Sequence, residues 1–169
     1  MKYIGAFFCV AAFMLSGLIY LENEKKKMRS FSGLSETFRI MKNELRAKLP
    51  PLSELIRQSA ESSADGVQPF FQKVLSGFDE IGEKDFSAIW NEAAGESFPF
   101  FSGEMLGRLC QLGTVLGQTA GETQGDILEN TAAFFEAEEK KMKEKMPGTR
   151  KLALGLTACA GFLTVIALC

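Results

Sequence analysis

The chain has 169 residues, 46% of them hydrophobic, and a formal net charge of −2. It contains no histidine, so the commonest general base and metal-ligating side chain is missing, which excludes most familiar hydrolase and metalloenzyme sites. Its four cysteines form neither a C-x-x-C motif nor a zinc-ligand spacing. We therefore expect no catalytic residues, no metal site, no cofactor and no disulfide framework.

Two uncharged apolar segments lie at the ends of the chain. Residues 3–21 carry no charge over nineteen positions, and residues 152–169 carry none over eighteen. At about 1.5 Å per residue, a helix of either length crosses about 30 Å of hydrocarbon. We predict transmembrane helices at residues 1–21 and 152–169. A cleaved signal peptide is the alternative for the first segment, and a buried core helix for the second.

The charges beside these segments predict their orientation. Basic residues close to a span tend to stay in the cytoplasm. Those on the inner flanks are Lys25, Lys26, Lys27, Arg29, Lys140, Lys141, Lys143, Lys145, Arg150 and Lys151, whereas the outer ends carry only Lys2. Residues 22–151 are therefore expected to form a cytoplasmic domain of a cell-membrane protein.

Apolar residues between the two segments recur at intervals of three and four, which predicts α-helix almost throughout. The first helix ends before Pro50 and Pro51, and Pro51 can serve as the first residue of the second helix. A third and a fourth helix are short and rich in aromatic residues. The expected inward-facing residues of these four helices are Phe31, Leu34, Phe38, Met41, Leu45, Leu52, Leu55, Ile56, Ala60, Phe70, Phe71, Val74, Leu75, Phe78, Phe86, Ile89, Trp90 and Ala93.

Ser102 is the expected N-cap of a fifth helix, and a long sixth helix is expected to end at Pro147 and Gly148. Their expected inward-facing residues are Met105, Leu106, Leu109, Cys110, Leu112, Leu116, Ile127, Leu128, Thr131, Phe134, Phe135 and Met142. No segment alternates with period two. We predict an all-α fold without a sheet: a six-helix bundle of helical hairpins, flanked by an N-terminal and a C-terminal transmembrane helix. The aromatic rings are expected to fill its core, and a stacking platform for a cofactor is the alternative.

Charge is strongly partitioned along the chain. Residues 22–48 and 140–151 together have a net charge of +9, from fourteen basic and five acidic side chains. Residues 52–139 have a net charge of −12, from four basic and sixteen acidic side chains. The basic part favours contact with anionic lipid of the bilayer. The acidic part disfavours nucleic acid and favours a basic protein partner, with solubility as the alternative reason for its charge.

Glycines stand at every fourth residue in one segment, at Gly113, Gly117, Gly121 and Gly125. A phosphate-binding loop is disfavoured, because the segment follows a helix and has Glu122 and Asp126 where cations are needed. Four glycines in one unbroken helix would cost about 4 kcal/mol. We predict instead that Gly113 and Gly117 let another helix cross closely, and that residues 117–125 contain the turn of a tight helical hairpin.

The two apolar ends, the helical middle and the motif LGTVLG followed by GETQGDILENTAAFFEAEEKK resemble the stage III sporulation protein AB family. That family is similar in turn to the F-type platform domain of type II secretion and type IV pilus systems, where a G-E-x-[ST]-G-like turn opens the closing helix. Gly121, Glu122 and Gly125 match this turn, but Thr123 and Gln124 replace the x-[ST] pair. The resemblance covers nearly the whole chain.

The resemblance implies a structural platform in a mother-cell complex that forms a channel or feeding apparatus across the double membrane during endospore formation. It also implies a location in the mother-cell membrane facing the forespore. The implied partners are a secretion-type ATPase, stage III sporulation protein AA, and other stage III sporulation membrane proteins. Glu122, Asp126 and Glu129 are candidate partner-binding residues. A platform of another secretion or pilus-type system is the alternative.

Two further function classes are disfavoured by the residues themselves. A membrane-bound enzyme needs a carboxylate pair, a Ser/Lys dyad or an intramembrane ionisable group, whereas the acidic residues here have the pattern of a solvated surface. We therefore predict that the protein is not an enzyme. A pore formed by the two spans needs several copies, because neither span has a polar face. Gly155, Ala158 and Gly161 are instead expected at a helix interface, possible in a homo-oligomer.

Overall fold

The computed structural model describes the backbone of residues 2–118 and 123–145, with side chains from residue 22 onward. The chain divides into two compact units, one of residues 1–28 and 140–169 and one of residues 29–139. Six α-helices and one 3-10 helix lie in the described residues, which contain no β-strand. The predicted all-α class is therefore confirmed.

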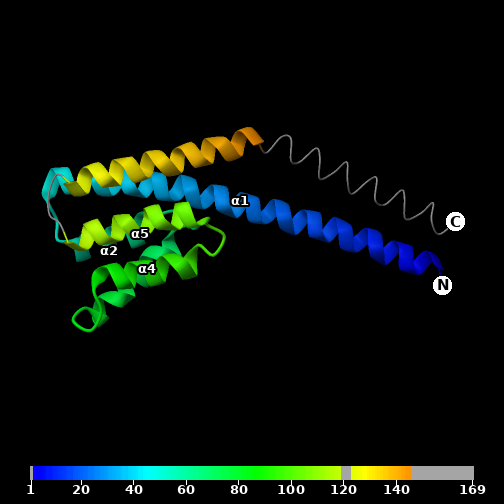
Figure 1. Ribbon diagram of the computed structural model, residues 1–169, viewed down its shortest axis with the longest axis horizontal. Helices are drawn as coiled ribbons and strands as arrows, with labels where there is room; N and C mark the ends of the chain where they lie inside the picture. The colour runs from blue at the N-terminus through cyan, green and yellow to red at the C-terminus, as the bar shows by residue number, and fades with distance from the viewer. Residues whose placement is uncertain (1, 119–122, 146–169) are drawn as a thin grey trace. The chain divides into compact units, whose positions relative to one another are not determined.

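The elements follow one another with short connections, as Figure 1 shows. They are α1 (Lys2–Lys48), α2 (Leu52–Ser62), α3 (Gln68–Ser76), the 3-10 helix η1 (Gly77–Glu80), α4 (Phe86–Ser97), α5 (Gly103–Gln118) and a last helix of residues 123–145. Within the larger unit, the last helix runs beside α1 and antiparallel to it, because Arg39 pairs with Glu136 whereas Arg46 pairs with Asp126.

The larger unit is organised around one aromatic core. Phe31 and Phe38 of α1 both lie against Phe135 of the last helix, with ring centroids 5.8 and 6.3 Å apart. Phe38 also meets Phe71 of α3 at 6.4 Å. The core continues from Phe71 through Phe70 to Trp90 of α4, at centroid distances of 4.9 and 4.8 Å. All these rings are fully buried, so the predicted core role of the aromatics is confirmed.

The apolar stripe of α1 is confirmed, and two helix boundaries differ from expectation. Pro51 is the N-cap of α2 rather than its first residue, because its ψ of 149° is extended. Phe78 was expected in the third helix but lies in η1. The α-helix ends at Ser76, and the next residue, Gly77, packs beneath Ile89 of α4, at a point where a Cβ would overlap the isoleucine side chain. Ser102 caps α5 as predicted, with its Oγ accepting from the Met105 N–H at 3.5 Å.

The membrane spans remain predictions. No helix among the residues whose side chains are described is both long and apolar enough to cross a bilayer. The predicted spans, residues 1–21 and 152–169, lie outside those residues, although the backbone of residues 2–21 is helical. The expected end of the sixth helix at Pro147 and Gly148 also lies outside the described residues, where this helix is followed to residue 145.

Candidate functional site

The glycine segment begins at the crossing of α4 and α5. A Cβ at Gly113 would overlap Cδ1 and Cγ of Trp90, so a side chain there is incompatible with the buried indole. The indole Nε1–H donates to the carbonyl oxygen of Leu109 at 2.8 Å, one turn before Gly113 on the same helix. The missing side chain thus lets α4 approach closely enough to hydrogen-bond the backbone of α5.

Gly117 continues this contact one turn later. A Cβ there would lie 3.2 Å from Cδ1 of Phe86, the first residue of α4. Helix α5 is described as far as Gln118, and the next described residue, Thr123, is helical again, so most of the predicted turn, residues 119–122, lies outside the described residues. Gly125 lies beside Arg46, whose Nε would be 3.8 Å from a Cβ, while Gly121 and Glu122 lie outside the described residues.

Gln124 is a structural residue of this turn that the sequence analysis did not single out. Its side chain is 9% exposed, and its Nε2–H donates to the Leu116 carbonyl oxygen at 3.2 Å. Gln124 therefore links the first turn of the last helix to the last described turn of α5.

The candidate partner-binding acids lie in a ladder of ion pairs between the last helix and α1. Lys42 Nζ lies 2.9 Å from Glu129 Oε2, Arg39 lies 2.5 Å from Glu136, and Arg46 lies 3.9 Å from Asp126. The hydrogen bond from Lys42 lowers the pKa of the Glu129 carboxyl. Glu129 is thus engaged within the fold, whereas the Asp126 side chain is 74% exposed and only loosely paired.

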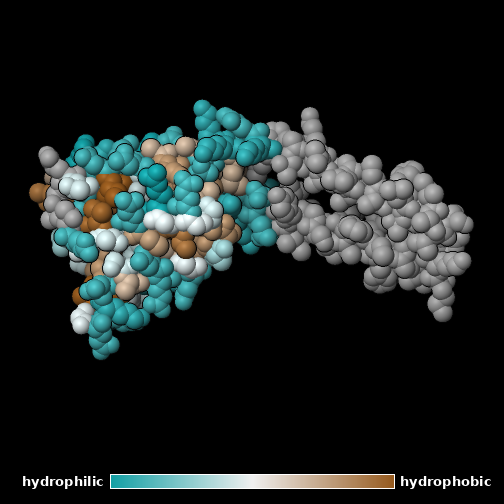
Figure 2. Space-filling view, in the orientation of Figure 1, coloured by the Kyte–Doolittle hydropathy of each residue, from teal (hydrophilic) through white to brown (hydrophobic). Residues whose placement is uncertain are grey.

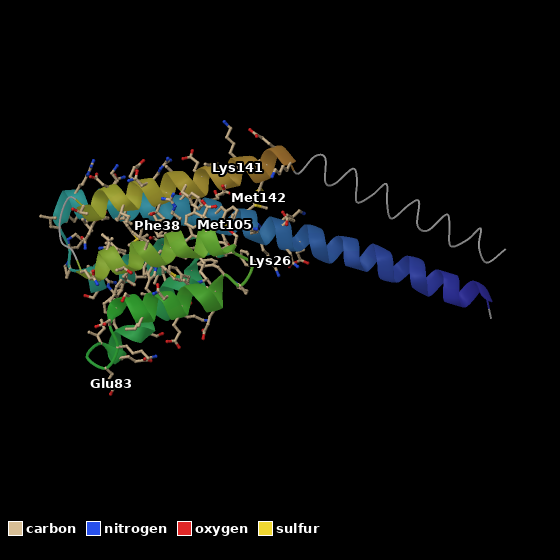
Figure 3. All side chains as sticks on the ribbon, viewed as in Figure 1. Lys26, Phe38, Glu83, Met105, Lys141 and Met142 are labelled. Atoms are coloured by element: carbon tan, nitrogen blue, oxygen red, sulfur yellow. The ribbon has the colours of Figure 1, made fainter. Side chains whose placement is uncertain are left out.

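A second group of acids surrounds the loop between η1 and α4. Figure 3 shows Glu83 at the tip of this loop. Hydrogen bonds from Lys84 to Glu80 and Glu92 raise the pKa of the lysine to about 12. Its positive charge is therefore paired with two carboxylates of the same unit.

Two shallow grooves flank the bundle. One, of about 190 Å³, runs beside Lys73 and Glu96, and one, of about 300 Å³, lies between α1 and the last helix.

The visible face of the unit is mostly hydrophilic, with separate hydrophobic patches (Figure 2). Among the side chains that the structure describes, the exposed large hydrophobic ones are Ile40, Leu49, Ile81 and Phe100. Among the side chains described, no three Cys, Asp or Glu residues gather closely enough to hold a metal ion.

The sequence that forms this all-helical unit matches a known protein family. The family model of stage III sporulation protein AB matches residues 2–169. The chain belongs to the stage III sporulation protein AB family. A sporulation-related role follows from this membership. Neither the curated proteins nor the solved structures contain a match, so the similarity of this family member to the F-type platform domain stays a prediction.

The family match includes the two glycine-containing motifs at the end of α5 and the start of the last helix. In this stage III sporulation protein AB family member, the LGTVLG motif forms the end of α5 against α4, and the GETQG motif leads into the last helix. Gln124, one of the two residues at which the chain departs from the family-like turn, donates to the Leu116 carbonyl oxygen. Gly113, Gly117 and Gln124 of these motifs thus have structural roles.

Proposed function

We propose that this chain is a structural platform in the mother-cell membrane of a sporulating cell, with a helical unit that docks a cytoplasmic secretion-type ATPase, stage III sporulation protein AA. The match of the family model to residues 2–169 carries the proposal. The two predicted spans anchor the platform, and the platform has no catalytic activity of its own. Other stage III sporulation membrane proteins complete the complex.

The arrangement of α1 and the last helix supports an anchored platform. Phe31 of α1 and Phe135 of the last helix are in contact. The points where the chain leaves the unit, near residues 29 and 139, therefore belong to the same end of this helix pair. The ion-pair ladder joins the two helices along their length. A partner bound to this unit is therefore connected through two helices to both predicted anchors.

The acids at the start of the last helix are the proposed docking site for the ATPase. Asp126 is exposed and its pair with Arg46 is long, so its carboxylate is available to a basic partner residue. Glu122 precedes it in the sequence, and Glu129 follows one turn later. Because Glu129 is held by Lys42, its charge is partly balanced within the fold, so Glu122 and Asp126 are the acids proposed to pair with the partner.

The test is retention of the ATPase by the full-length chain in detergent. We expect the double variant Glu122→Gln with Asp126→Asn to retain the ATPase about fivefold less than the unsubstituted chain, because two surface charges contribute up to about 1 kcal/mol each. Asp65→Asn is the matched control, since Asp65 is an exposed acid in the connection between α2 and α3. Unchanged retention by a folded double variant would exclude this docking site.

A further inference from the structure

The connection between α4 and α5 is an uncharged aromatic loop, defined here as residues 98–101 with the sequence FPFF. Its rings are ordered by stacking: Phe98 and Phe101 lie 4.6 Å apart with an interplanar angle of 9°. Phe100 meets Phe98 and Phe101 edge-on, at 6.3 and 5.3 Å. Phe98 is 2% exposed, whereas Phe100 is 38% exposed. One ring of the cluster therefore projects into solvent.

The backbone presents this ring rigidly. The Phe101 N–H donates to the Phe98 carbonyl oxygen at 3.0 Å, which closes a four-residue turn. Pro99 occupies the second position of the turn, where the fixed φ of proline is favoured, and Phe100 occupies the third. The turn is closed, and the rings of Phe98 and Phe101 are stacked on each other. The chain around Phe100 is therefore already ordered before its ring meets another surface.

The aromatic loop lies at the end of the unit where the chain leaves it. Phe101 contacts Phe31 of α1 at 5.3 Å and Phe135 of the last helix at 5.6 Å. Phe31 is two residues from the unit boundary at Arg29, and Phe135 is four residues from the boundary at Glu139. The loop is thus packed against the two helices near both exits.

The connections from this end to the predicted spans are short. The seven residues 22–28 reach at most about 25 Å, even when fully extended. For comparison, the part of α1 that belongs to the unit, residues 29 to 48, is about 30 Å long. The connection is therefore shorter than the unit itself. The connections also carry Lys25, Lys26 and Lys27, and Lys140, Lys141, Lys143 and Lys145, whose charge is complementary to anionic lipid. A bilayer that holds the spans is therefore within reach of this end of the unit.

We propose that the aromatic loop is a membrane-contact site that inserts Phe100 into the interface of an anionic bilayer. This inference rests on the membrane anchoring in the proposed function, but not on docking of the ATPase. Aromatic side chains favour the boundary between headgroups and acyl chains, and basic residues nearby strengthen the attachment. The contact gives the unit a third point of attachment beside its two chain connections, and so restricts its tilt on the membrane.

The test places a tryptophan at the proposed contact in the full-length chain. Phe100→Trp is reconstituted into nanodiscs of phosphatidylcholine and phosphatidylglycerol, with or without bromine near the top of the acyl chains. Ile81→Trp is the matched control, since Ile81 is 50% exposed and lies beyond the other end of α4. The unsubstituted chain supplies the background of the buried Trp90.

We expect bromination to reduce the emission of the tryptophan introduced at position 100 roughly twofold, because interfacial side chains lie about 5–10 Å into the bilayer boundary. The tryptophan introduced at position 81 should show no loss. Equal quenching at the two positions, or none at position 100, would overturn the proposal. A blue shift at position 100 without bromine quenching would assign the loop to a protein contact instead. A chain that fails to insert into nanodiscs would overturn this site and the proposed anchoring together, whereas loss of ATPase docking would leave the site intact.

Discussion

Two helix pairs in the larger unit are held together by different means. The α4–α5 pair depends on the absence of a side chain at Gly113, which lets the Trp90 indole reach the Leu109 carbonyl. The α1 pair with the last helix combines buried rings inside with a ladder of exposed ion pairs outside. The first contact allows almost no variation in shape, because protein interiors are close-packed. The ion pairs between α1 and the last helix allow changes of side chain or geometry at a small cost in stability. The reason is that exposed charges are solvated whether or not they are paired.

The largest expected effect is at the crossing of α4 and α5. Gly113→Ala should destabilise the fold by about 2–3 kcal/mol, because the new methyl group displaces a buried indole and weakens its hydrogen bond, despite the better helix propensity of alanine. Chemical denaturation of the full chain in detergent, followed by circular dichroism, measures this change. Gly107→Ala on the same helix is the matched control, since a Cβ there meets no atom within 4 Å. It should be neutral or stabilising by up to about 1 kcal/mol. A similar response of both variants would contradict the tight crossing.

A smaller effect of opposite sign is expected where α1 ends. Leu49 has a φ of 45°, its N–H bonds the Leu45 carbonyl oxygen at 3.1 Å, and its side chain is 71% exposed. A left-handed residue in this position is usually glycine. Leu49→Gly should therefore stabilise the fold by about 0.5–1 kcal/mol, because the strain of a left-handed leucine exceeds the entropy cost of glycine. Leu49→Ala keeps the unfavourable conformation and serves as the control. Stabilisation by alanine equal to that by glycine would show that conformation is not the cause.

The smallest effect is expected in the ion-pair ladder, and it depends on pH. Hydrogen bonding to Lys42 lowers the pKa of Glu129 in the folded state below its ordinary value of 4.5. The pair therefore stabilises the fold above about pH 4.5, and the contribution is lost as the pH falls through the lowered pKa. Glu129→Gln should cost about 0.5 kcal/mol near pH 7, since the glutamate side chain is 41% exposed, and less in high salt.

The control for the ladder is Glu36→Gln. Glu36 is an exposed acid on α1, the helix that carries Lys42, and no ion pair involving it is formed with the described side chains. Its substitution should leave the free energy of unfolding near pH 7 unchanged, because no ion pair is lost. A cost for Glu129→Gln that persists unchanged at pH 2 would show that the carboxylate charge is not responsible.

Local features of the fold could be predicted from the sequence because they depend on neighbouring residues. The stripe from Phe31 to Leu45 repeats at helical spacing, and Ser102 has the character of an N-cap, so both were identified correctly. The closeness of Gly113 to another helix was also expected, although its partner Trp90 was not named. The spacing of residues predicts which face of a helix is packed, but it does not predict which other helix packs against that face.

Features that depend on distant residues could not be predicted in this way. Lys42 and Glu129 are 87 positions apart, so an acidic run that the sequence presents as a solvated surface is partly neutralised in the fold. The hydrogen bond from Gln124 to the Leu116 carbonyl oxygen and the packing of Ile89 over Gly77 also join residues that are separate in the sequence. Each is decided by tertiary packing rather than by local preference.

The burial of Trp90 has a practical consequence. It is the only tryptophan in the chain, it is fully buried, and its N–H is bonded to the backbone of a neighbouring helix. Its intrinsic fluorescence therefore reports on the packing around α4, which includes the contact with α5 and the ring contacts with Phe70 and Phe71 of α3. Opening of the α4–α5 crossing would admit water to the indole and shift its emission to longer wavelength, so a partner that loosens these helices can be detected without any added label.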